Sequence, residues 1–187
     1  MTPCIRLLRD FIEDRRGAAL IELGFAVPVL TLVLLGCFEA TRYVLLHQKL
    51  DRAASTTADL VAQQDGITTA QLDDLFEAAT RVMEPYDLGA NGRIIVSSVY
   101  RPGAAAATVV WQRLTAAGIA ATSELGAAGA TAALPAGFTV DAGENVIVAE
   151  VFYSYTPLFL SAMFEATQVS HNAFNRPRIS NLTQITP

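Results

Sequence analysis

A long apolar run near the start of the chain gives way to an amphipathic pattern with the same helical period. The run covers 21 residues, from Ala18 to Phe38, and Glu22 is its only charged residue. About 20 such residues are what a helix needs to cross a bilayer, so the run predicts one transmembrane helix. Pro28 lies inside it and predicts a kink, because proline leaves one helical carbonyl without its backbone donor.

The helical period continues beyond the apolar run. Apolar and small residues recur every three or four positions, with charged residues between them, at Tyr43, Leu46, Leu50, Ala53, Thr57 and Val61. Gly66 is the first residue that predicts an end. We therefore expect one helix over 18–65, about 70 Å long, with its first half in lipid and its outer half packed on protein.

The rest of the chain, 66–187, predicts one globular unit of helix and strand. Thr68 and Gln71 form a capping-box pattern that starts a second helix, and Pro85 ends it. Its apolar face consists of Leu72, Leu75, Phe76, Ala79 and Val82. Runs rich in β-branched and aromatic residues predict strands at 94–100, 108–114 and 145–155, and a weaker pattern predicts a fourth near 166–175. The expected fold class is α+β, with the helices packed on an antiparallel sheet of about four strands.

One segment has no regular apolar period. Residues 115–137 are rich in alanine and glycine, so we expect a long flexible excursion between the second and third strands. A plain surface insertion and a contact for a partner are both open for it.

Composition and charge exclude several classes of function. The chain carries a formal net charge of −5 and has no basic stretch interleaved with aromatics, which speaks against nucleic-acid binding. Its two cysteines, Cys4 and Cys37, offer neither metal-ligand spacing nor a disulfide framework. The four arginines before the apolar run predict a cytoplasmic leader and a periplasmic body, because basic residues that flank a first span stay inside.

The junction between leader and apolar run has a specific arrangement. Two arginines precede Gly17, Ala18 follows it, and Glu22 is the fifth residue after the glycine. This resembles the processing site of type IV prepilins, which implies a cut by prepilin peptidase between Gly17 and Ala18. A carboxylate inside a membrane helix costs on the order of 3 kcal/mol and needs a reason. In that family the glutamate is thought to pair with the freed α-amino group of a neighbouring subunit, which implies pairing of Glu22 with Ala18 of the next copy.

The likeness narrows within that family. The stretch RRGAALIELGFAVPVLTLVLLGCFEATRY resembles TadE-like minor pilins of the tight-adherence (Flp) system, as do the run NVIVAEVFYSYTPLF and the RPR at 176–178. Leu23 departs from the pattern, since many relatives have phenylalanine there. The resemblance implies a leader over 1–17, a pilin-like domain over 66–187, and a role in pilus assembly or initiation. The implied partners are prepilin peptidase, other minor pilins, the major pilin and the inner membrane, with no cofactor, metal or small-molecule substrate.

Three other readings compete with a pilin. Leu34, Leu35, Gly36 and Cys37 imitate the sequence before a lipidated cysteine, so a lipoprotein is one alternative. An uncleaved, single-span periplasmic binding protein is the second.

A membrane-tethered enzyme is the third. The sequence offers few residues for nucleophilic or metal catalysis, since His47 and His171 are its only histidines and it has no nucleophile-elbow motif. Glu144 and Glu150 lie too far apart along one strand to act as an acid and base pair. We therefore expect no catalytic residues.

Overall fold

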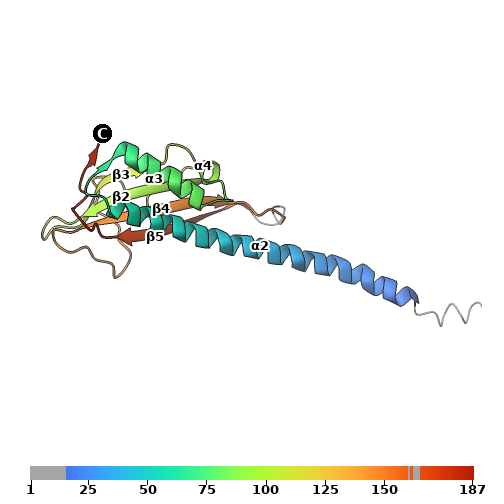
Figure 1. Ribbon diagram of the computed structural model, residues 1–187. Helices are drawn as coiled ribbons and strands as arrows, with labels where there is room; N and C mark the ends of the chain where they lie inside the picture. Colours follow the sequence, from blue (N-terminus) through green and yellow to red (C-terminus); the bar gives the residue numbers. More distant parts are fainter. Residues whose placement is uncertain (1–15, 160, 162–164) are drawn as a thin grey trace, which may run out of the picture.

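The structure is a computed structural model that describes residues 16–159, 161 and 165–187; the predicted leader thus lies outside the described residues up to position 15. Its main feature is the helix α2, Arg16–Ala62, which projects from a globular body as a stalk (Figure 1). The helix runs through Pro28 without a break, so the kink at that residue stays a prediction. It ends three residues before the expected boundary at 65, and just after it the Gln64 amide donates to the Val61 carbonyl in a tighter turn.

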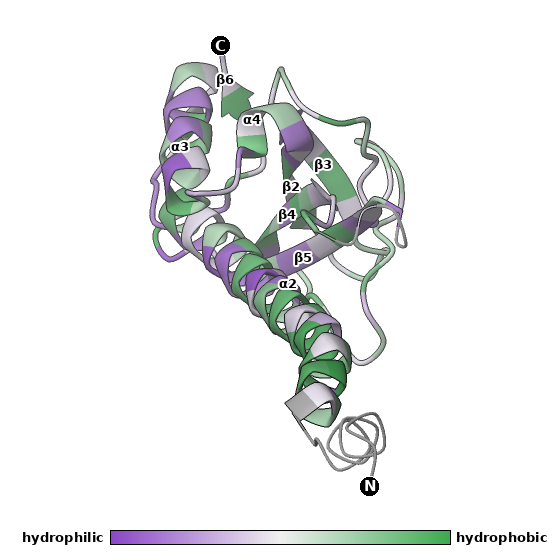
Figure 2. Ribbon diagram, turned by 90° about the vertical axis from the view of Figure 1, so that its right-hand side faces the viewer, coloured by the Kyte–Doolittle hydropathy of each residue, from purple (hydrophilic) through white to green (hydrophobic). Residues whose placement is uncertain are grey.

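The two halves of α2 differ in what surrounds them. The first half stands clear of the body, and Figure 2 shows that most of its residues are hydrophobic. The second half packs on the body through the predicted face: Leu46, Leu50, Ala53, Thr57 and Val61 are buried. Tyr43, the first residue of that face, is 39% exposed and marks where the packing begins. Alanines at 53, 54 and 58 are also buried, and their small side chains let the helix lie close to the sheet.

The second helix, α3, spans Thr69–Val82 and lies beside α2. The predicted capping box is present: the Thr68 hydroxyl accepts from the Gln71 amide, and the Gln71 side chain accepts from the Thr68 amide. The predicted apolar face is confirmed, with Leu72, Phe76 and Ala79 buried and Leu75 and Val82 partly buried against them. A short helix, α4, Leu88–Asn91, leads into the first strand of the sheet.

The sheet confirms the α+β class. Its strands are β2 Gly92–Tyr100, β3 Thr108–Leu114, β4 Asn145–Tyr155 and β5 Thr167–Asn175, all antiparallel in the order β3-β2-β4-β5. The fourth strand, which the sequence indicated only weakly, pairs with β4 along its whole length. The outer half of α2 packs against β4 and β5.

The central strand β4 is buried on both of its faces. Alternate residues of β4 face α2 and α3, namely Ile147, Ala149, Val151, Tyr153 and Tyr155. The opposite face carries a second core in which Val146 and Val148 pack with Val99, Val109, Leu125 and Val140. Because neither face of β4 is exposed to water, its sequence is nearly continuously apolar and does not alternate with polar residues.

The segment 115–137 supplies part of that second cover, which corrects the expectation of a plain surface excursion. Leu125 is buried in the second core. Glu150 is 1% exposed on β4, and its carboxylate accepts hydrogen bonds from the Ser123 hydroxyl and, at 2.7 Å, from the Glu124 amide. Burial raises the pKa of Glu150, and these two bonds oppose that effect. The segment lacks an apolar period because its contacts are single side chains on an extended path.

The C-terminal segment ties the body together. Strand β6, Ile185–Thr186, pairs in parallel with β1, Ile67–Thr68, just before α3. The Leu182 carbonyl accepts from the Trp111 indole at 2.7 Å. In the RPR, the Arg178 amide donates to the last residue of α2, the Ala62 carbonyl, at 2.9 Å. This satisfies one carbonyl at the end of the helix, and the Gln64 side chain satisfies another by donating to the Leu60 carbonyl at 3.2 Å.

Gly118 offers a test of how tightly segment 115–137 is held. Its φ is +110°, and a Cβ built there would lie 1.8 Å from the Gly92 carbonyl oxygen at the start of β2. We expect Gly118→Ala to lower the free energy of unfolding by roughly 2–4 kcal/mol, from backbone strain and overpacking together. Thermal unfolding followed through Trp111 fluorescence measures this.

The matched control is Gly103→Ala. Gly103 also has a positive φ, +58°, but its Cβ would meet nothing within 4 Å. It should therefore lose only the conformational cost, about 1 kcal/mol. Equal losses for the two variants would mean that the segment yields easily at Gly118.

Candidate assembly site on the N-terminal helix

The projecting half of α2 is an unpartnered apolar surface. From Gly17 to Phe38 every large apolar side chain except the half-buried Leu35 is exposed, including Leu20, Phe25, Leu30 and Leu34. A contiguous apolar surface of this extent is not stable in water and requires lipid or another helix. Among the described residues, this is the one helix long and apolar enough to cross a membrane, and it fits a single-pass membrane anchor.

Gly17 and Ala18 lie in the first turn of α2 and are exposed. A Cβ built at Gly17 meets nothing within 4 Å, so the fold itself places no constraint on this position. A protease that binds an extended backbone would have to unwind this turn. Helix ends fray readily because their first amides have no helical partner, so the cost is small.

Glu22 lies on the same side of the helix as Ala18, because residues four apart are neighbours on a helix surface. It is exposed and forms no ion pair with any other residue that the structure describes. In a membrane this carboxylate needs a partner from outside the chain, from water, or from the chain's own first residues.

Two threonine hydroxyls of α2 form hydrogen bonds with carbonyls of their own helix. Thr31, one turn later, donates its hydroxyl hydrogen bond to the Val27 carbonyl at 2.8 Å. Thr41 does the same with the Cys37 carbonyl at 2.8 Å. Hydroxyl groups bonded in this way lose their need for water, which suits a helix in lipid.

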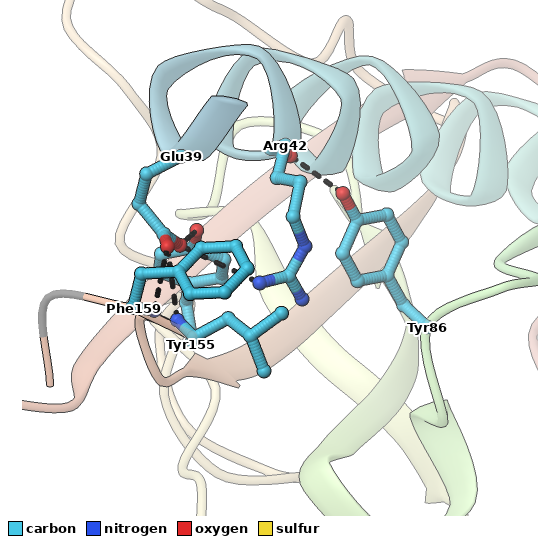
Figure 3. A network of polar contacts seen from close by, with 6 residues as sticks. Glu39, Arg42, Tyr86, Tyr155 and Phe159 are labelled. Atoms are coloured by element: carbon cyan, nitrogen blue, oxygen red, sulfur yellow. Dashed lines mark hydrogen bonds and ion pairs between the residues drawn. The ribbon is translucent and has the colours of Figure 1, made fainter. Parts of the chain in front are cut away.

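Where the apolar half ends, a buried carboxylate joins α2 to the body (Figure 3). Glu39 is 7% exposed and accepts a hydrogen bond from the Tyr155 hydroxyl at the end of β4. It also accepts from the backbone amides of Leu158 at 3.0 Å and Phe159 at 3.2 Å. Arg42, one turn along the helix, lies 3.5 Å from the same carboxylate. Local sequence patterns do not predict this contact, because Glu39 lies 116 residues before Tyr155.

Electrostatics at Glu39 favour the ionised form. Burial raises the pKa of Glu39, but hydrogen bonds from Tyr155, Phe159 and Leu158 and the charge of Arg42 outweigh burial and hold it below its usual range. Burial and the hydrogen bond to the Glu39 carboxylate raise the pKa of Tyr155 to about 12. Tyr86 completes the cluster by donating to the Arg42 carbonyl at 2.5 Å.

The two histidines of the chain meet between α2 and β5, which the sequence did not indicate. His47 Nδ1 lies 2.9 Å from His171 Nε2, and the rings cross edge to face. Asp51 faces the other side of His171, at 3.9 Å between its Oδ1 and Nδ1. Burial, and then the charge of His171, lower the pKa of His47.

This pair predicts a pH dependence of stability. Because the folded-state pKa of His47 is depressed, the unfolded chain binds the proton more readily below its ordinary pKa of about 6.5. The melting temperature of the detergent-solubilised protein should therefore fall as pH drops from about 7.5 to 5.5, and the slope should flatten in His47→Gln. The chain contains two histidines, so His171→Gln is the second arm. An unchanged slope in both variants would contradict the role of the pair.

In the described part of the chain, the other candidate side chains do not converge on a common site. Among residues 16–159, 161 and 165–187, no cluster of three His, Cys, Asp or Glu side chains is placed to hold a metal ion. Glu144 pairs with Arg176 at 2.8 Å, while Glu150 lies under the 123–124 backbone, so the two carboxylates share no site. Cys37 is a free, exposed thiol on α2.

The comparisons with known proteins match the helix alone. Residues 17–59 match the family model described as TadE-like protein, which confirms the resemblance over this segment, while the likeness at 145–159 and 176–178 stays a prediction. The matched segment begins at Gly17 and includes Glu22, Pro28, Glu39 and most of the packed half of α2. No curated protein and no solved structure matches the chain.

Proposed function

We propose that this chain, TadE-like over residues 17–59, is a minor pilin of a type IVc (Flp/Tad) pilus that supports assembly or initiation together with other minor pilins. The observation that carries the proposal is the combination on one helix of Gly17, Ala18 and Glu22 with an apolar surface that the chain leaves uncovered. The same helix can lie in the inner membrane before assembly and among other pilin helices afterwards.

Processing would create a binding partner for Glu22. Prepilin peptidase would cut between Gly17 and Ala18 and leave a protonated α-amino group on Ala18, whose ordinary pKa is near 8. Ala18 and Glu22 lie one helical turn apart on the same side of α2. An adjacent pilin helix that is shifted by about one turn along the axis can therefore bring its amino end to the Glu22 carboxylate. Between apolar helices such a pair is screened little by water, and the mutual attraction offsets the desolvation of both charges.

The globular body would act as the part that selects partners. It is held to the helix by Glu39 and by the Leu46 to Val61 face, so force or displacement on the helix passes directly to the sheet. Its expected place is the periplasm, and the outside of the cell once it is part of a pilus. We propose a structural rather than an enzymatic role, with no cofactor.

The experiment is to identify the N-terminus of the membrane-extracted protein after co-expression with and without its prepilin peptidase. Mass spectrometry should find Ala18 first with the peptidase and an intact leader without it. Retention of residues 1–17 in both samples would replace this proposal with the uncleaved single-span protein. A chain that begins at lipid-modified Cys37 would instead identify a lipoprotein.

A further inference from the structure

The body carries a small apolar patch on the end from which the helix projects. Leu158 and Phe159 follow β4 and are 58% and 48% exposed, and Phe38 on α2 is 50% exposed. The rings of Phe38 and Phe159 meet edge to face at 5.5 Å between centroids. We call these three residues the base patch. Large apolar side chains gathered in this way on a surface mark a contact with something apolar.

Hydrogen bonds to the helix fix the backbone of the base patch. Glu39 accepts hydrogen bonds from the amides of both Leu158 and Phe159, so the two backbone units are fixed to the helix one residue beyond Phe38 (Figure 3). The carboxylate is itself buried and bonded to Tyr155. Truncating either apolar side chain would leave these backbone bonds unchanged.

The length of the span sets the depth of the base patch. The apolar run from Ala18 to Phe38 covers 21 residues, about 30 Å of helix, which is the thickness of the hydrocarbon core. Phe38 therefore lies where the helix leaves the core, and Phe159 lies at the same level because their rings touch. Aromatic side chains are enriched at this level of membrane proteins, where the apolar ring meets the headgroups.

We propose that the base patch inserts into the interfacial region of the outer leaflet of the inner membrane, as a second membrane contact beside the transmembrane helix. Lipid is the occupant that the geometry favours, because the patch is continuous with the apolar surface of α2 and lies at its lipid exit. The contact seats the end of the sheet that holds Tyr155 on the bilayer and restricts tilting of the body about the helix. Extraction into a pilus must then break this contact as well as withdraw the span.

The test places one fluorophore at a time on the full chain in nanodiscs of phosphatidylethanolamine and phosphatidylglycerol. In a background without Cys4 and Cys37, Leu158→Cys carries the probe in the patch and Leu34→Cys carries it in the span. Ala104→Cys is the matched exposed control, because it lies in the β2–β3 hairpin at the opposite end of the sheet, roughly 30 Å away. Trp111 fluorescence checks that each labelled protein is folded.

Lipids with a nitroxide near the headgroup should quench the probe at 158 strongly and the probe at 104 hardly at all, while aqueous iodide should do the reverse. Equal access of iodide to 158 and 104 would overturn the proposal. Protection of 158 from both quenchers would also overturn it, since a second protein copy would then cover the patch. The measurement is independent of processing at Gly17, so its failure would leave the pilin proposal intact.

Discussion

Replacing Gly17 with Asp is expected to abolish removal of the leader, leaving only the full-length chain in membranes that contain prepilin peptidase. The physical reason lies in the protease and not in the fold of this protein. At Gly17 the backbone must lie extended and close to the enzyme, where a side chain obstructs it. A side chain at Gly17 should not disturb the fold of the protein itself, because a Cβ there meets nothing within 4 Å and the position is exposed. A loss of processing can therefore be attributed to the protease.

Gly24→Ala is the matched control for this variant. Gly24 is another exposed glycine of the same helix, and a Cβ there also meets nothing within 4 Å. It should insert and be processed like the wild type, with mature protein beginning at Ala18 in mass spectra. A Gly17→Asp protein that still loses its leader would remove the cleavage site from this position.

Replacing Glu22 with Gln or Ala is expected to leave insertion and cleavage unchanged but to reduce incorporation into pili or minor-pilin complexes by at least about tenfold. Breaking a buried ion pair by removing one partner costs about 3–5 kcal/mol, because the other charge is left without compensation. Here the abandoned charge would be the amino group of Ala18 on the neighbouring subunit. Immunoblots of sheared pili against membrane fractions measure the ratio.

Two further variants separate charge from shape in this prediction. Glu22→Asp keeps the carboxylate and should retain part of the incorporation, whereas Leu23→Ala removes exposed apolar surface next to it and should have a small effect. Normal incorporation of both Glu22→Gln and Glu22→Ala would refute the pairing with Ala18. The Gly17 and Glu22 variants thus block incorporation for different reasons, and the identity of the N-terminal residue distinguishes them.

The elements with a local period could be predicted from the sequence. The span from Ala18 to Phe38, the packed face from Leu46 to Val61, the capping box at Thr68 and the strand at 145–155 all follow from spacing along the chain, because a helix or strand imposes its own period on the residues it buries. The same holds for the candidate assembly site, since Gly17, Ala18 and Glu22 lie within six consecutive residues.

Only the tertiary structure decided which distant residues meet. Glu39 bonds to residues 155–159, His47 meets His171, and segment 115–137 covers a second face of the sheet through Leu125 and its bonds to Glu150. These contacts join parts of the chain that are up to 124 residues apart and leave no periodic trace between them. Their partners are selected by the antiparallel register of β4 and β5 and by the path of α2 across them, which exist only once the sheet has formed.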